Sequence, residues 1–164
     1  MLLFCFTSLS RLSWFGRQAT RYQATTVFKM LDNLSHEQKI ELTHLIMNML
    51  DEWGVSHSDK IILLALPSQI RTRAMRRFYD NEALPDDGAV FERIDHLLGI
   101  ADALRTSFPL NGYMAAFWLN QKNHRFENKT PLNFMLEGGL DNVVAVRAHL
   151  DCAWDWHRSD SPSL

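Results

Sequence analysis

The chain has little cysteine and lacks the ligand spacings that are typical of metal centres. Its two cysteines, Cys5 and Cys152, lie far apart, which gives neither a metal-ligand spacing nor a disulfide framework, so reduced thiols are expected. The seven histidines include no pair with the spacing of a helical zinc site. His149 lies three residues from Cys152, but a metal there would need further ligands from elsewhere. We therefore expect no metal and no cofactor.

Other sequence patterns of catalysis are also missing. There is no glycine-rich phosphate loop, no nucleophile elbow and no pair of carboxylates in an apolar frame. Glu92 and Asp95 are predicted to lie on the solvated face of a helix. The formal net charge is −2, so any binding to nucleic acid must come from a local basic patch. These absences predict a protein that is not an enzyme.

The first 33 residues stand apart from the rest. Their apolar run is broken by serines and by Arg11, and it is shorter than the roughly 20 residues that span a bilayer. Basic residues follow this run, whereas a secretory signal has them before it. We favour a disordered leader, or an upstream start with the working protein beginning near Met30, over a weak amphipathic anchor. A cytoplasmic protein with no membrane association is expected.

The remainder is predicted to be all-α. Apolar residues recur at intervals of three and four, and capping residues such as Ser35, with Gln38 three positions on, precede the apolar stripes. Gly99 inside a long helix costs about 1 kcal/mol relative to alanine, which is acceptable where another helix crosses closely. Met114, Phe117 and Trp118 are predicted to face the core. The predicted helices cover about 35–53, 56–66, 68–78, 90–108, 110–119, 130–137 and 140–156.

A basic stretch follows the second predicted helix. Four arginines occur within the seven residues 71–77, after a turn at Leu66, Pro67 and Ser68. A buried helix, a turn and a basic helix form a helix-turn-helix pattern, in which arginine can contact phosphates or guanine. A solvated basic face is the alternative, because the motif is loose and no second basic patch supports it. The candidate DNA-binding residues are Ser68, Gln69, Arg71, Thr72, Arg73, Arg76 and Arg77.

Residues 118–139 combine a helix end, a polar loop and a short capped helix. Thr130 is a natural N-cap, and Pro131 suits the first helical position because its missing N–H is not needed there. Gly138 and Gly139 are predicted to end this short helix. A polar loop between two helices with clearly marked ends is more typical of a docking surface than of a catalytic site. The alternative is a helix-loop-helix that serves only its own core.

The same segment resembles a known family. Over about 117–154, the chain is similar to the toxin-binding region of the Xre/MbcA/ParS antitoxin family, with weaker similarity back to about residue 34. Two departures fall in the loop: Lys122 replaces a usual proline, and Asn128 replaces a usual glycine. The residues that carry the resemblance are Trp118, Leu119, Asn123, Phe126, Thr130, Pro131, Leu132, Gly138, Gly139 and Leu150.

The resemblance implies a partner and a domain organisation. Members of this family pair with RES-domain toxins, and their C-terminal end approaches the toxin's active site. We expect a helix-turn-helix domain at 34–108, a toxin-binding domain at 109–157 and a polar tail at 158–164. Trp154 and Trp156 cannot share one helix face. The candidate toxin-binding residues are Trp118, Asn123, Phe126, Thr130, Pro131, Trp154, Trp156, His157 and Arg158.

Three functional hypotheses follow. The first is an antitoxin of a type II toxin–antitoxin system, which occludes the active site of an NAD-consuming or ADP-ribosylating RES-domain toxin and holds no NAD itself. Binding to operator DNA as a homodimer, or as part of a larger toxin–antitoxin assembly, would add repression of its own operon. The second is a helix-turn-helix repressor with no toxin partner. The third is an adaptor with no role at DNA.

Overall fold

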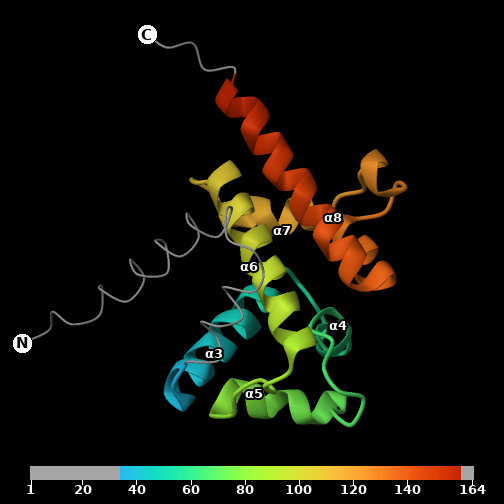
Figure 1. Ribbon diagram of the computed structural model, residues 1–164. Coiled ribbons are helices and arrows are strands. Elements are labelled where there is room, and N and C mark those ends of the chain that lie inside the picture. The colour runs from blue at the N-terminus through green and yellow to red at the C-terminus, as the bar shows by residue number, and fades with distance from the viewer. Residues whose placement is uncertain (1–33, 160–164) are drawn as a thin grey trace, which may run out of the picture.

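The structure is a computed structural model that describes residues 34–159, with side chains described through Cys152 (Figure 1). The predictions for residues 1–33 and for the end of the polar tail, 160–164, lie outside this range. All regular structure in the described residues is helical, which confirms the all-α prediction. No helix among them is long and apolar enough to cross a membrane. The elements are α3 (His36–Glu52), α4 (His57–Leu63), the 3₁₀ helix η1 (Thr72–Arg76), α5 (Arg77–Asp80), α6 (Gly88–Ser107), α7 (Tyr113–Asn120), the 3₁₀ helix η2 (His124–Phe126) and α8 (Pro131–Ser159).

Helix α3 begins and ends as its sequence predicts. The hydroxyl of Ser35 accepts from the backbone N–H of Gln38 at 3.3 Å, and the side chain of Gln38 accepts from the N–H of Ser35 at 2.9 Å. This reciprocal capping box satisfies donors that the first helical turn leaves free. Gly54 then takes a φ of +77°, a conformation that favours glycine and stops the helix.

The connection after α4 differs from the prediction. Helix α4 ends at Leu63, before Pro67, because the chain turns where Ala65 takes a φ of +51°. The N–H of Ile70 then donates to the carbonyl oxygen of Pro67 at 2.9 Å. Regular structure resumes only in η1 and continues as α5. The single helix predicted over 68–78 was therefore wrong in its first half.

A buried lysine joins helices α3, α4 and α5. Lys60 of α4 is 0% exposed, and its Nζ donates to Asp51 of α3 and to the hydroxyl of Tyr79 in α5, both at 2.5 Å. The Tyr79 hydroxyl also donates to Asp51 at 2.7 Å. Burial, followed by the hydrogen bond to Asp51, raises the pKa of Tyr79 well above its usual range. Burial of a lysine side chain is costly unless its nitrogen is paired and hydrogen-bonded in this way.

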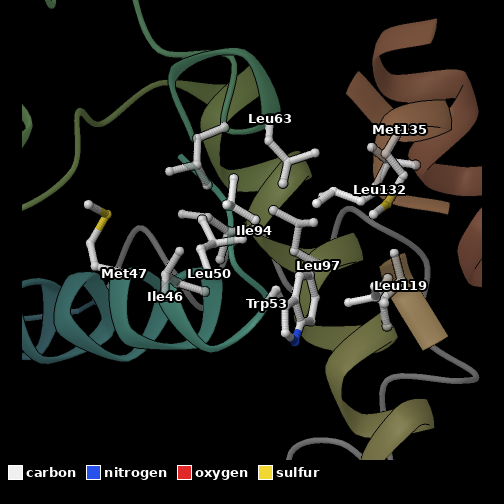
Figure 2. Packing of buried hydrophobic residues seen from close by; sticks show 14 of the residues in the cluster. Ile46, Met47, Leu50, Trp53, Leu63, Ile94, Leu97, Leu119, Leu132 and Met135 are labelled. Carbon is white, nitrogen blue, oxygen red and sulfur yellow. The ribbon is translucent and has the colours of Figure 1, made fainter. Parts of the chain in front are cut away.

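One core runs through the whole described fold. Helix α6 runs through the centre of the fold, with α3, α4 and α5 around its N-terminal half and α7 and α8 around its C-terminal half (Figure 1), and α4 also packs against α8. Because side chains of both predicted units share this core, the two units pack as one body. The division at residue 109 stays a prediction. The core side chains labelled in Figure 2 are Ile46, Met47, Leu50, Trp53, Leu63, Ile94, Leu97, Leu119, Leu132 and Met135.

Candidate functional site

The start of α8 is fixed by its capping residue. The hydroxyl of Thr130 accepts from the backbone N–H of Asn133 at 3.1 Å. Pro131 occupies the first helical position, as predicted, and is buried. Both residues were candidates for toxin contact, but in the structure they set where α8 begins and which way it points.

Helix α8 consists of two segments that meet at a kink. Gly139 takes φ +66° and ψ −142°, backbone angles that only glycine adopts at low cost. A Cβ on Gly138 would lie 1.9 Å from the side-chain nitrogen of Asn142. That nitrogen donates to the carbonyl oxygen of Phe134 at 2.7 Å. The two glycines therefore leave room for the side-chain amide of Asn142, which hydrogen-bonds a carbonyl oxygen near the end of the first segment.

The loop between α7 and α8 is held by its own backbone. The side-chain oxygen of Asn123 accepts from the backbone N–H of Arg125 at 3.0 Å, and the backbone N–H of Asn123 donates to the carbonyl oxygen of Lys129 at 3.0 Å. Glu127 and Asn128 have φ values of +57° and +59°. At Asn128, where the family pattern has glycine, asparagine is among the residues that tolerate this left-handed conformation.

An ion-pair bridge ties this loop to α8. The Nζ of Lys129 lies 2.6 Å from a carboxylate oxygen of Glu137 and 3.0 Å from one of Glu127. Hydrogen bonds to Glu137 and then to Glu127 raise the pKa of Lys129. Because the bridge is open to solvent, it contributes to the path of the loop more than to stability.

An aromatic cluster lies beneath the loop. The ring of Phe126 is 5.2 Å from that of Phe134, 5.4 Å from that of His149 and 6.3 Å from that of Trp118. The rings of Trp118 and His149 are stacked, with centroids 6.3 Å apart. Edge-to-face and stacked arrangements of this kind are the favoured ones. The cluster joins α7, η2 and both segments of α8 into one unit.

The surroundings of His149 favour the neutral form of its imidazole. Burial lowers its pKa first, and the nearby Arg125 and His124 lower it further. A neutral imidazole can stack on Trp118 without placing a charge among the rings. The residue is therefore part of the packing of the domain.

Helices α6 and α8 are joined by an arginine. A guanidinium nitrogen of Arg147 lies 2.7 Å from a carboxylate oxygen of Asp95 and 3.0 Å from Nδ1 of His96. Burial, followed by the charge of Arg147, lowers the pKa of His96. The prediction that Asp95 is solvated was wrong, because its side chain is 24% exposed and paired across the interface. Glu92, predicted alongside it, is exposed.

The toxin-binding residues predicted before the end of α8 mainly build the domain's interior. Phe126 and Pro131 are buried, whereas Trp118, Asn123 and Thr130 are half-buried. The prediction that these residues contact a toxin stays untested. Trp154, Trp156, His157 and Arg158 lie on the described backbone of α8, but their side chains lie outside the described residues.

An exposed apolar face on and beside α7 was missed. Leu110 is 99% exposed, Tyr113 88% and Phe117 56%. Phe117 was predicted to face the core, but Leu119 is the α7 residue that is fully buried. The eight-residue helix starts at Tyr113, three residues later than predicted, and is too short for its periodicity to fix the buried side. The spacing of Tyr113 and Phe117 by four residues was the available signal.

The basic stretch is exposed. Arg71, Arg73 and Arg76 form no ion pair with a described residue, whereas Arg77 lies 3.3 Å from Glu82. In a 3₁₀ helix, residues three apart are eclipsed, so Arg73 and Arg76 of η1 share one side. The other candidates for DNA contact, Ser68, Gln69 and Thr72, are also exposed.

Comparison with known proteins identifies the C-terminal part. Residues 111–151 match the family described as antitoxin Xre/MbcA/ParS C-terminal toxin-binding domain. The chain is also 33% identical over 101 residues to the protein from Sinorhizobium fredii (strain NBRC 101917 / NGR234) named "Uncharacterized protein y4oB", an alignment that covers 62% of this chain and 74% of that relative. No solved structure gives a significant match. The chain therefore belongs to the Xre/MbcA/ParS family of antitoxins, and its residues 111–151 form the C-terminal toxin-binding domain.

Proposed function

We propose that this protein is the antitoxin of a type II pair and that it neutralises a RES-domain toxin by covering the toxin's active site. The observation that carries the proposal is the toxin-binding domain at 111–151. Within it, the loop, the aromatic cluster and the kinked α8 pack together as one unit. The proposed function is binding, without catalysis or a cofactor, in the cytoplasm where the toxin would act on NAD.

The end of α8 is the part best placed to enter a cleft. Arg147 anchors this helix to α6, and beyond the anchor the last turns of α8 extend past α6 in Figure 1. The helix is described to Ser159. It would carry Trp156, His157 and Arg158 into the toxin, where the arginine can pair with groups that hold the nucleotide substrate.

Co-expression with the RES-domain toxin tests this proposal. The full chain should restore growth, and a chain ending after Asp151 should not, because the core remains while the projecting turns are removed. A chain ending after Ser159 is the matched control and should restore growth. Rescue by the chain ending after Asp151 would exclude occlusion by the end of α8, and failure of the full chain would exclude the antitoxin role.

A role at DNA is a second proposal, supported by a separate observation. Three exposed arginines with no ion-pair partner among the described residues lie within 71–76, and such groups are free to contact phosphates. The short η1 and α5 differ from a regular recognition helix, so the proposed contact is mainly with the DNA backbone. A homodimer, or a toxin–antitoxin assembly, would place two such surfaces on the operator of its own operon.

A further inference from the structure

The exposed apolar face beside α7 has no partner within the described residues. Leu110, Tyr113 and Phe117 are the most exposed of the large apolar side chains there. Asn120, the last residue of α7, donates to the carbonyl oxygen of Trp53 at 3.1 Å, so the end of α3 borders the face. We call the surface formed by Leu110, Tyr113 and Phe117 the α7 face. Exposed apolar residues that gather in one patch mark interaction sites, whereas singly scattered ones are ordinary.

The charged residues that flank the α7 face in the sequence are all basic. Between Asp102 and Glu127 the sequence contains no acidic residue. Lys122 and Arg125, which follow α7 in the loop, are exposed and form no ion pair with a described residue. The face is therefore apolar at its centre and basic along the loop that follows it.

We propose that the α7 face is a docking surface for the toxin, and that the toxin presents an apolar depression with an acidic rim. The inference rests on the proposed function. Tyr113 and Phe117 lie inside the residues matched as toxin-binding, and aromatic residues are enriched at protein interfaces. This contact would be separate from the one made by the end of α8. The α7 face would bind the surface of the toxin, and the end of α8 would enter its active-site cleft.

A second copy of the chain is a poorer occupant for this surface. A two-fold symmetric contact brings the same surface patch of both subunits together. Such a contact would bring the basic loops of both copies to one interface, and like charges at an interface disfavour association. A toxin with acidic groups around its apolar depression avoids this repulsion.

Binding of the full chain to a catalytically disabled RES-domain toxin, encoded beside its gene, is the test. Replacing Tyr113→Gln together with Phe117→Gln should weaken the Kd at least about tenfold. Ile62→Gln is the matched control, because Ile62 of α4 is 52% exposed and lies outside residues 111–151. Unchanged melting temperatures would show that the variants fold. Lys122→Glu with Arg125→Glu should slow association and reduce its dependence on salt.

The outcomes separate the two proposals. Weaker binding by the Tyr113/Phe117 variant alone supports the α7 face. Equal binding by the wild type and both variants overturns the α7 face and leaves the proposed function intact. If the wild-type chain does not bind the toxin, the proposed function fails, and the α7 face fails with it. A change from dimer to monomer in light scattering, with toxin binding unchanged, would assign the face to self-association and overturn the proposal.

Discussion

A Cβ atom on Gly99 of α6 would lie 2.5 Å from Nε of Arg147 on α8. The two helices therefore cross where α6 has no side chain, and the guanidinium occupies that space. Arg147 reaches Asp95 and His96 on α6 from this position. Glycine forms helices poorly, but at this position the contact of Arg147 with α6 offsets that cost. Only glycine leaves room for this contact.

Replacing Gly99→Ala should destabilise the protein by about 1 kcal/mol. Alanine improves helix formation by about 1 kcal/mol, but displacing Arg147 weakens hydrogen bonds to charged groups, each worth about 1.5–3 kcal/mol. Urea denaturation measures the difference. In an Arg147→Ala background, the same change at Gly99 should be neutral or stabilising, because the obstructing side chain is gone. An equal change in the free energy of unfolding in the wild-type and Arg147→Ala backgrounds would mean that the contact between Gly99 and Arg147 contributes nothing to stability.

Replacing Gly139→Ala should destabilise the fold by at least about 1–2 kcal/mol, because its φ of +66° is unfavourable for any residue with a Cβ. Gly112→Ala is the control: its φ is −60° and no atom lies within 4 Å of a built Cβ. That change should stay within about 0.5 kcal/mol of the wild type. Similar denaturation midpoints for the two variants would show that α8 does not need its kink.

The stability of the fold should fall as the solution is acidified below about pH 6.5. Burial, followed by neighbouring positive charge, lowers the pKa values of His96 and His149 below 6.5. The unfolded chain then takes up protons more readily than the folded one, so stability is complete above that pH and is lost as pH falls through the folded pKa values.

The replacement His149→Phe tests this origin, because it keeps an aromatic ring on Trp118 and removes the titrating group. Melting temperatures at pH 7.5 and 5.5 should differ less in this variant than in the wild type. An identical drop in both proteins would assign the acid sensitivity to other groups.

Removing two arginines should change how DNA binding responds to salt. Arg73→Ala with Arg76→Ala should reduce the slope of log affinity against log salt by about 0.9 for each phosphate that the variant no longer neutralises. The probe is a duplex from upstream of the protein's own gene. Arg105→Ala is the control, because Arg105 is exposed but pairs with Asp102 on α6. An unchanged slope in the double variant would remove η1 from the DNA-binding proposal.

The sequence predicts local features of this fold well. The capping box at Ser35, the start of α8 at Pro131 and the break at Gly139 each depend on a few neighbouring residues, and each is confirmed. Gly99 was also predicted to lie under a crossing helix, and the structure supplies Arg147 there. In these cases the residue type itself fits the backbone conformation or the close approach that the position needs.

Features that depend on distant partners were predicted less well. The solvated face expected for Asp95 is covered by α8, which is far away in sequence. The first half of the helix expected over 68–78 is irregular, and regular structure resumes only at Thr72, so tertiary context overrides the local periodicity there. The α7 face was missed because an eight-residue helix presents too few positions to identify its buried side.

Titration of a purified RES-domain toxin with the purified full chain tests the central claim most directly, with NAD consumption as the signal. Occlusion predicts that NAD consumption falls in proportion to added antitoxin and stops when every toxin site is occupied. A toxin that stays fully active in a complex proven by light scattering would contradict occlusion, and a toxin that forms no complex with the chain would contradict the antitoxin role itself.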